Sequence, residues 1–194
     1  MQIGINEGET VGRIVIGIPG DASEVEKNAA EEIGRKAGAQ NILVISEGLA
    51  AAIGAGLPIA EPNGTMVVDI GAGTTDIAVL SMNGVATSSS LKVAGNAFDE
   101  TIARYVRRKH GVIIGQTTAE DVKIQIGSVY PRNEDPTMVV KGRDAKNGIP
   151  RELVLSASEV SEVLIRMGRQ IADEVLSVLE DTSPELVGDI AQTG

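Results

Sequence analysis

The first third of the chain carries a strand–helix–strand pattern, and this pattern limits the fold more than any other feature. Residues 13–18 and 41–46 are short, continuous apolar runs, as in buried strands. Between them lies a helical pattern with Ser23 and Glu26 at capping-box positions and Gly38 at its end. Two strands joined through one helix pair in parallel, so the sequence predicts an α/β protein. The predicted helix has an apolar stripe made of Val25, Ala29, Ile33 and Ala37.

After residue 60 the predicted connections change from a crossover to tight turns. Residues 65–70 and 75–82 are predicted strands on either side of a glycine-containing turn, and Asn83-Gly84 favours a type I′ hairpin into the next strand. A second hairpin is predicted for 137–144 and 150–156. These elements predict mixed sheets with helices. The predicted helices are 49–56, 99–110 ending at Gly111, one from a Thr118–Asp121 capping box to Ile126, and 160–179 capped by Ser156 and Glu159.

The charge and the lack of cysteine exclude several classes of protein. The chain has 27 acidic and 17 basic residues, a net charge of -10, which argues against a nucleic-acid-binding surface. Without cysteine there is no disulfide and no thiolate metal site, which is compatible with the cytoplasm. The first residues do not resemble a signal peptide, and the apolar stretch 49–60 is too short to span a bilayer.

The stretch VVDIGAGTTD places a carboxylate where a buried strand ends. Ligands of α/β proteins bind at the carboxyl ends of strands, and Asp69 lies at such an end. Gly71 and Gly73 allow close approach to the backbone, whose N–H groups can form a nest for phosphate, and Thr74 and Thr75 add hydroxyls. A carboxylate beside such a nest indicates Mg²⁺ held through water. The same ten residues also fit a tight hairpin turn with a capping aspartate, so the motif alone leaves both interpretations open.

The surrounding sequence resembles the MreB family of bacterial actin homologues. The likeness covers nearly all of residues 13–190. It runs from RIVIGIPGDASEVEKNAAEEIG through ISEGLAAAIG and VVDIGAGTTD to VAGNAFDETI, TTAEDVKIQIGS and TSPELVGDI. The resemblance implies an actin-like ATPase fold of the ribonuclease H-like type, with two lobes around an ATP cleft. It assigns residues 1–60 to the first lobe, 61–93 and 160–194 to the lower subdomain of the second lobe, and 94–159 to its upper subdomain.

The resemblance also implies roles for single residues. Glu47 would position the attacking water with Thr74 as its helper, although Gly48 replaces the family's usual proline and should loosen this turn. Taken alone, Glu47 fits a solvated strand-end acid better, and Glu120 with Lys123 fits a surface ion pair. The implied phosphate motif comprises Asp69, through a water-held Mg²⁺, with Gly71, Ala72, Gly73, Thr74 and Thr75. The implied ribose and adenine positions are Gly95, Asn96, Glu120 and Lys123.

The function implied by the resemblance is that of a cytoskeletal filament protein. Such a protein binds ATP and Mg²⁺, polymerises with copies of itself in the cytoplasm and reaches membrane-associated cell-wall machinery through partners. Direct membrane contact is not supported, because GETVG has neither an amphipathic segment nor an apolar pair.

Two alternatives stay open: a chaperone-type ATPase, which would need a substrate-binding domain, and a non-catalytic structural fragment. Residues 1–11 do not resemble the family, and the first phosphate motif and the adenine loop are not found. We therefore expect a central fragment, incomplete at both ends, whose own ATP hydrolysis is feeble or absent.

Overall fold

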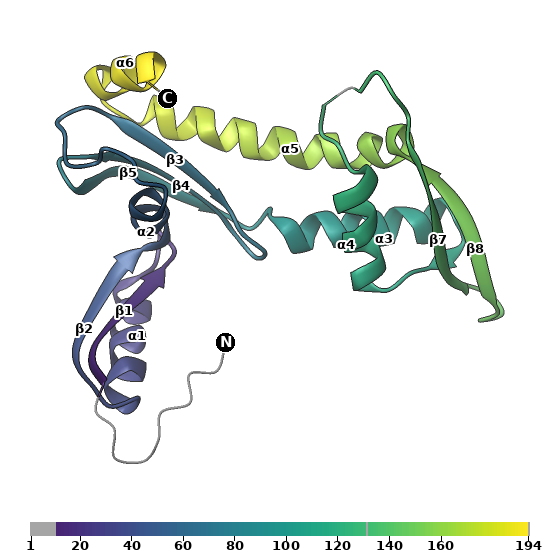
Figure 1. The fold of residues 1–194 in the computed structure, drawn as a ribbon, viewed down its shortest axis with the longest axis horizontal. Helices are drawn as coiled ribbons and strands as arrows, with labels where there is room; N and C mark the ends of the chain where they lie inside the picture. Colours follow the sequence, from purple (N-terminus) through teal and green to yellow (C-terminus); the bar gives the residue numbers. More distant parts are fainter. Residues whose placement is uncertain (1–10, 131, 194) are drawn as a thin grey trace. The chain divides into compact units, whose positions relative to one another are not determined.

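The computed structural model describes residues 11–130 and 132–193 (Figure 1). Residues 1–10, which include the first three residues of the GETVG segment from which we expect no direct membrane contact, lie outside the described residues. The chain forms two compact units. The first contains the described residues up to Asp69, then Asp76–Ser90 and the residues from Val178. The second contains Ile70–Thr75 and Leu91–Ser177.

The first unit begins with the predicted strand–helix–strand arrangement. Strands β1 (Val11–Ile18) and β2 (Ala39–Ser46) pair in parallel, and helix α1 (Glu24–Lys36) is their crossover (Figure 1). The predicted capping box is confirmed, because Ser23 N–H donates to Glu26 Oε2 at 2.8 Å and Glu26 N–H donates to Ser23 Oγ at 3.3 Å.

The side of α1 that contacts the sheet is not the predicted apolar stripe. Val25 and Ile33 are 77% and 66% exposed. Gly34 is buried instead, and a Cβ at this position would lie 3.1 Å from the Ile42 side chain of β2. Close approach at a glycine therefore sets how α1 packs on β2, and the stripe is left at the surface.

The rest of the first unit is built around a three-stranded sheet. Strands β3 (Thr65–Ile70), β4 (Thr75–Ser81) and β5 (Gly84–Leu91) lie in this order, with β4 in the middle. Helix α2 (Glu47–Gly54) starts two residues before its predicted first residue, because Ser46 Oγ accepts a hydrogen bond from Leu49 N–H and caps it. A small core of Ala52, Ile59, Ala78 and Leu80 joins α2 to this sheet.

The turn between β4 and β5 lies one residue before the predicted one. Its two central residues are Met82 and Asn83, with φ of 53° and 61°. Two positive φ values in a two-residue loop are those of a type I′ turn. Contacts from elsewhere hold this position: Met82 N–H donates to Glu61 O at 3.0 Å, and Asn83 N–H donates to Ile59 O at 2.7 Å. Tertiary hydrogen bonds outweigh the local preference for Asn-Gly.

The last helix of the first unit, α6 (Pro184–Thr193), was not predicted. It begins at Pro184, and proline is common as the first residue of a helix as well as just after a helix end. Gly64 N–H, at the start of β3, donates to Asp189 Oδ2 at 2.9 Å. A Cβ at Gly64 would lie only 2.5 Å from Leu186 O, so glycine lets α6 pack closely there.

The second unit has its own antiparallel sheet. Strands β7 (Thr137–Asp144) and β8 (Pro150–Ser156) form the predicted hairpin, and the short strand β6 (Val112–Ile113) pairs with β7 (Figure 1). This sheet is separate from the sheet of β3, β4 and β5.

Helices α3 and α4 lie wholly within the second unit. Helix α3 (Gly95–His110) ends at Gly111 as predicted, where φ is 66°, but starts four residues before its predicted start. Helix α4 (Gln116–Ile126) begins after Gly115, so the predicted Thr118 cap is wrong; Ala119 N–H already bonds to Gly115 O at 3.0 Å. The core residues include Ile102, Val106, Val112, Val122, Val140, Leu155, Val160 and Leu164.

Helix α5 (Ala157–Glu180) starts in the second unit and ends in the first. Its predicted cap is confirmed, because Glu159 N–H donates to Ser156 Oγ at 3.3 Å. Even this helix is not apolar enough to cross a membrane, and no other helix of the described ranges meets that requirement.

Candidate functional site

The glycine-containing turn between β3 and β4 is closed by its own backbone. Gly71 N–H donates to Thr74 O at 2.9 Å. Ala72 and Gly73 at the tip are exposed, and a Cβ at Gly73 would meet nothing within 4 Å. The backbone at the tip is therefore accessible, and a phosphate nest formed by it stays a prediction. Thr75, at the end of the turn, is buried, and its hydroxyl donates to Val93 O at 2.7 Å.

The same turn supplies hydrogen-bond partners to the start of α3. Gly95 N–H donates to Gly71 O at 3.0 Å, and Asn96 N–H donates to Ala72 O at 2.8 Å. No side chain caps this helix, so these carbonyls satisfy N–H groups that would otherwise lack partners. A Cβ at Gly95 would lie 3.3 Å from Gly71 O and 3.5 Å from Lys123 Nζ. Glycine favours this close approach, which brings together residues predicted from distant stretches of the sequence.

Lys123 connects α4 to the start of α3. Its Nζ lies 2.8 Å from Asp99 Oδ1 and donates to Gly95 O at 3.2 Å. Asp99 is only 3% exposed, so this is a buried carboxylate with a mostly buried cation partner. The alternative of a surface pair with Glu120 is wrong, because Glu120 is exposed and Lys123 pairs with Asp99.

A pocket of about 590 Å³ lies beside this lysine. We call it the Lys123 pocket. It is lined by Ile70, Gly71, Gly95, Phe98, Lys123, Gly127, Ser128, Val129 and Leu164. Its apolar walls suit a small organic ligand with an apolar ring; Lys123, whose charge is already paired with Asp99, can offer a remaining N–H to an acceptor of that ligand. Three predicted site residues, Gly71, Gly95 and Lys123, line it; Asn96 and Glu120 do not.

The first unit contains an acidic cluster made of Glu47, Asp69 and Asp76. Glu47 is the first residue of α2, and its side chain lies over β1, since a Cβ at Gly17 would be 3.3 Å from Glu47 Cγ. Burial raises the pKa of Glu47, and the charges of Asp76 and Asp69 and a hydrogen bond with Asp76 raise it further. Carboxylates that repel one another in this way favour a cation or a shared proton.

Asp76 is the member of this cluster that sequence reasoning missed. It is 4% exposed on β4, and its Oδ1 has no hydrogen-bond partner among the described residues. A buried carboxylate oxygen without a partner indicates a bound water or ion. The signal in the sequence was the second acid of VVDIGAGTTD, two residues after Thr74.

The acidic cluster fits a hydrated metal rather than a directly coordinated one. In the described part of the chain, no three His, Asp or Glu side chains are grouped so as to hold a metal ion themselves. Mg²⁺ commonly keeps several waters and uses one or two carboxylates. Asp69, which is half-buried at the end of β3, and the unpartnered oxygen of Asp76 are suitable groups for such water-mediated contacts.

Gly48 does not loosen the segment after Glu47, contrary to prediction. It is a buried residue inside α2, and a Cβ there would lie 2.7 Å from Ala78 Cβ. The lack of a side chain lets α2 approach β4, which holds Glu47 at the first turn of a packed helix.

Comparisons with known proteins agree with this arrangement. The MreB/Mbl protein family matches residues 4–194, so the match also includes most of the start that we expected to differ from the family. The cell shape-determining protein MreB of Escherichia coli (strain K12) is 46% identical over 94% of this chain and 52% of its own length. The cell shape-determining protein Mbl of Bacillus subtilis (strain 168) is 42% identical over 94% of this chain and 55% of its own length.

Two solved structures show the same fold. The crystal structure of MreB 5 of Spiroplasma citri bound to AMPPNP has a TM-score of 0.90 and 39% identity, and covers 95% of this chain and 56% of that one. The MamK double helical filament has a TM-score of 0.74 and 25% identity, and covers 93% of this chain and 53% of that one. The chain thus spans about half the length of these relatives and has the predicted actin-like fold. It belongs to the MreB/Mbl protein family.

Proposed function

We propose that this chain is the nucleotide-binding part of an actin-like filament protein that determines cell shape. The observation that carries this proposal is the Lys123 pocket, because residues from three separate stretches that were predicted to bind ATP line a single cavity. Its volume of about 590 Å³ is in the range of small-ligand sites.

Each part of the candidate site has a proposed role. The apolar walls and Lys123 bind the nucleoside, Asn96 and Glu120 are proposed to contact it although they do not line the pocket, and the backbone at the exposed Ala72–Gly73 tip binds phosphate. Asp69 and Asp76 hold Mg²⁺ through water; the bound metal supplies charge neutralisation for phosphoryl transfer. Glu47, with Thr74, orients a water molecule.

The relatives support nucleotide binding and filament formation. MreB 5 of Spiroplasma citri was crystallised with AMPPNP and with ADP, and MamK forms a double helical filament. The curated relatives are named cell shape-determining proteins, which favours the filament role over the chaperone-type alternative. We further propose that the protein works in the cytoplasm and reaches the cell-wall machinery at the membrane through partners.

Equilibrium binding of a fluorescent ATP analogue to the chain, with and without Mg²⁺, tests nucleotide binding. Val129→Glu places a charge on an apolar, half-exposed wall of the pocket, where it should disfavour packing of the nucleoside, and we expect affinity to fall at least tenfold. Val139→Glu is the matched control, because Val139 is similarly exposed, 57% against 50%, and lies on β7 outside the pocket.

Two results would contradict the proposal. If the chain binds no nucleotide, the alternative of a non-catalytic structural fragment is correct. If both glutamate variants weaken binding equally, nucleotide binds but not in this pocket. Sedimentation of filaments with and without ATP, performed on the same preparations, tests polymerisation separately from binding.

A further inference from the structure

A second pocket, of about 610 Å³, lies between helices α3 and α5 of the second unit. We call it the arginine pocket. It shares no lining residue with the Lys123 pocket. Its lining residues are Thr101, Arg104, Tyr105, Arg108, Glu162, Val163 and Arg166. The α3 residues recur at spacings of three and four, so they form one stripe of that helix.

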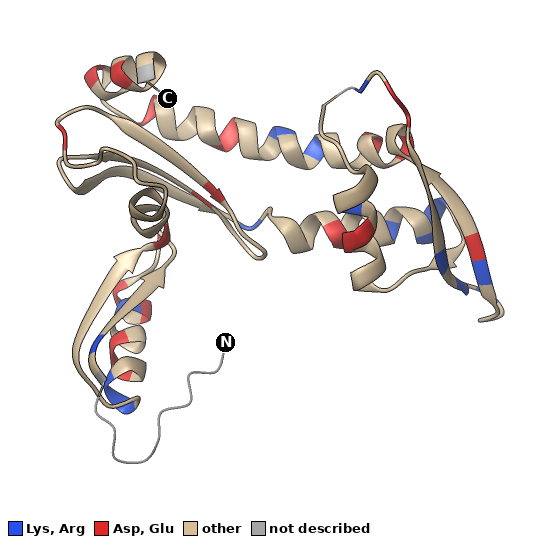
Figure 2. Cartoon of the chain, in the orientation of Figure 1, with Lys and Arg blue, Asp and Glu red and all other residues tan. Residues whose placement is uncertain are grey.

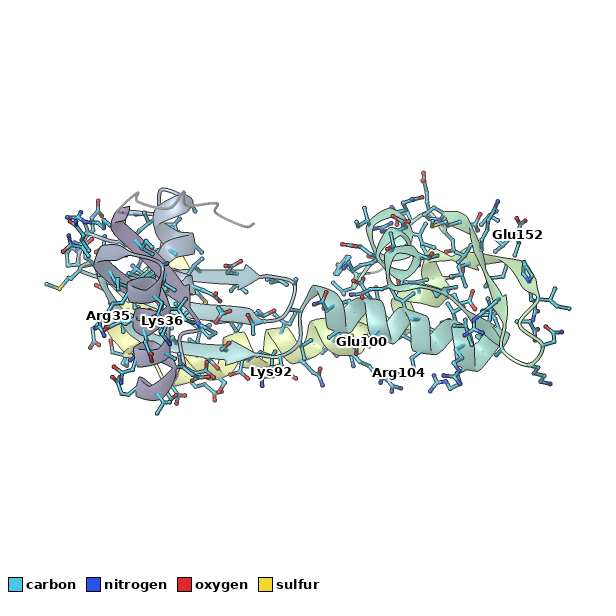
Figure 3. The ribbon with its side chains drawn as sticks, turned by 90° about the horizontal axis from the view of Figure 1, so that it is seen from below. Arg35, Lys36, Lys92, Glu100, Arg104 and Glu152 are labelled. Carbon is cyan, nitrogen blue, oxygen red and sulfur yellow. The ribbon has the colours of Figure 1, made fainter. Side chains whose placement is uncertain are left out.

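The three arginines of this pocket have little to neutralise them. Arg104 is 3.9 Å from Glu100 on the same helix, and both side chains are at least 70% exposed, so this pair contributes little (Figure 3). Within the described ranges, no ion pair is found for Arg108 or Arg166. The pocket lining carries three positive charges and the one negative charge of Glu162.

This local charge is opposite in sign to that of the whole chain, which is -10. Figure 2 shows blue Lys and Arg segments on both α3 and α5. Like charge over the rest of the molecule repels an acidic partner, so a concave basic site is needed to attract and orient one.

The floor of the pocket is rigid. Tyr105 is 6% exposed, and its hydroxyl donates to Glu159 Oε1 at 2.9 Å and accepts from Lys109 Nζ at 2.8 Å. The two hydrogen bonds hold the tyrosine in place before a partner binds, and the small exposed part of its ring lies beside the half-buried Val163 in the pocket lining. Preorganisation of this kind lowers the entropy lost on binding.

We propose that the arginine pocket binds an acidic peptide segment of a partner protein. Planar guanidinium groups match carboxylates in a two-point geometry, and arginine and tyrosine are frequent in the centres of protein interfaces. The rim arginines take Asp or Glu side chains, and the Tyr105–Val163 floor takes an apolar side chain between them. Glu162 in the lining and the concave shape disfavour a flat anionic membrane. This inference does not depend on nucleotide binding.

The test measures fluorescence anisotropy of a labelled peptide, Glu-Glu-Leu-Glu-Glu-Leu-Glu-Glu, with the whole chain. The site variant carries Arg104→Gln, Arg108→Gln and Arg166→Gln. The matched control carries Arg35→Gln, Lys36→Gln and Lys92→Gln, which removes three positive charges from exposed positions outside the pocket (Figure 3). We expect at least a tenfold loss of affinity in the site variant, at most a twofold loss in the control, and tighter binding by Glu162→Gln.

Three outcomes would overturn the proposal: no binding of the peptide to the unmodified chain, equal losses in the two triple variants, or equal binding of a peptide with glutamine in place of glutamate. Cosedimentation with vesicles of equal parts phosphatidylglycerol and phosphatidylcholine distinguishes a lipid surface. Vesicle binding lost only in the site variant, without peptide binding, would assign the pocket to membranes instead. Circular dichroism verifies that all variants are folded.

Discussion

At the scale of single residues, the pair of Lys123 and Asp99 joins stability to the candidate site. Removing only the lysine leaves a buried carboxylate without its cation, so we expect Lys123→Met to lower the unfolding free energy by about 3 kcal/mol. Replacing both, as Lys123→Met with Asp99→Leu, should recover part of this loss because no charge is left buried. Urea unfolding of the single and double variants measures the difference; a double variant less stable than Lys123→Met would contradict the pairing.

Asp76 gives a second prediction at this scale. Its buried carboxylate repels Glu47, so Asp76→Asn should raise the unfolding free energy by about 1 kcal/mol when no divalent ion is present. Mg²⁺ should then stabilise the unmodified chain more than the variant. Thermal unfolding with EDTA and with Mg²⁺ measures both effects, and Asp21→Asn, at an exposed position of the same unit, is the control. If Mg²⁺ raises the unfolding temperatures of Asp76→Asn and Asp21→Asn by the same amount, Asp76 is not part of the metal site.

The sequence could predict site residues that belong to a local motif, but not those defined by distant contacts. Gly71, Gly95 and Lys123 stood in recognisable stretches, and the structure places them in one pocket. Asp99 carries no local signal of its role, and Asp76 carries only a weak one, as the second acid of VVDIGAGTTD. Asp99 matters because Lys123, 24 residues later in the sequence, comes within 2.8 Å of it, and only the packing of α4 against α3 brings this about.

At the scale of elements, glycines decide how closely helices approach strands. Gly48→Ala would place a methyl group 2.7 Å from Ala78 Cβ, so we expect α2 to shift and the unfolding free energy to fall by about 1–3 kcal/mol. Gly54→Ala, in the last turn of the same helix, meets nothing within 4 Å and should stabilise by about 0.5–1 kcal/mol. Chemical denaturation should therefore show a lower unfolding free energy for Gly48→Ala and a higher one for Gly54→Ala. If both variants lose the same unfolding free energy, the contact with Ala78 is not the reason for the loss.

The junction of α3 and α5 should make stability depend on pH. Burial alone would raise the pKa of Glu159, but hydrogen bonds from Lys109, His110 and Tyr105 outweigh it and lower the pKa to about 2. A carboxyl whose pKa is lowered on folding stabilises the fold above its ordinary value of 4.5. This contribution, at most about 3 kcal/mol, is lost as pH falls from 4.5 towards 2.

Glu159→Gln should remove this dependence. Between pH 5 and pH 2.5 the unmodified chain should lose more unfolding free energy than the variant, as measured by urea unfolding at several pH values. Glu162→Gln, at an exposed position on the same helix, should keep the pH profile of the unmodified chain. Identical profiles for all three proteins would show that Glu159 is not a stabilising carboxylate.

Most elements were predicted because their patterns are local, and the errors have tertiary causes. The capping box of α1, the hairpin of β7 and β8, and the end of α3 at Gly111 follow from neighbouring residues. The Met82–Asn83 turn, by contrast, is held by carbonyls of the 59–61 segment. Helix α3 starts early because carbonyls of the 71–74 turn cap it, which no local pattern reveals.

At the scale of the whole molecule, the boundary between the two units falls within the pair of strands β3 and β4. Strands β3 and β4 belong mainly to the first unit, while the turn that joins them belongs to the second, because Gly71 and Ala72 bond to the start of α3. The division into three parts at residues 60, 93 and 159 stays a prediction. Local sequence patterns predict where a turn lies. They do not show that the turn belongs to one unit while the two strands that it joins belong mainly to the other.

The two units differ in core size, and this leads to the last prediction. Among the described residues, the buried core cluster of the second unit has thirteen members, whereas the cluster that joins α2 to β4 in the first unit has four, two of them alanine. The first unit also leaves Val15, Val25, Ile33 and Leu43 more than half exposed. Since burial of apolar surface is the main stabilising contribution, the first unit should unfold at a lower urea concentration than the second.

Hydrogen exchange measured by mass spectrometry over a urea series tests this order. Backbone amides of β1 and β2 should lose protection first, and those of α3 and β7 should keep it until the main transition, because the opening free energy of each segment follows the core beneath it. Tyr105 lies in the core of the second unit, so its fluorescence should report the later step. A single transition shared by the amides of both units and by this fluorescence would contradict the prediction. The two units would then unfold cooperatively, with α5 and the β3–β4 strand pair, which belong to both units, as the coupling elements.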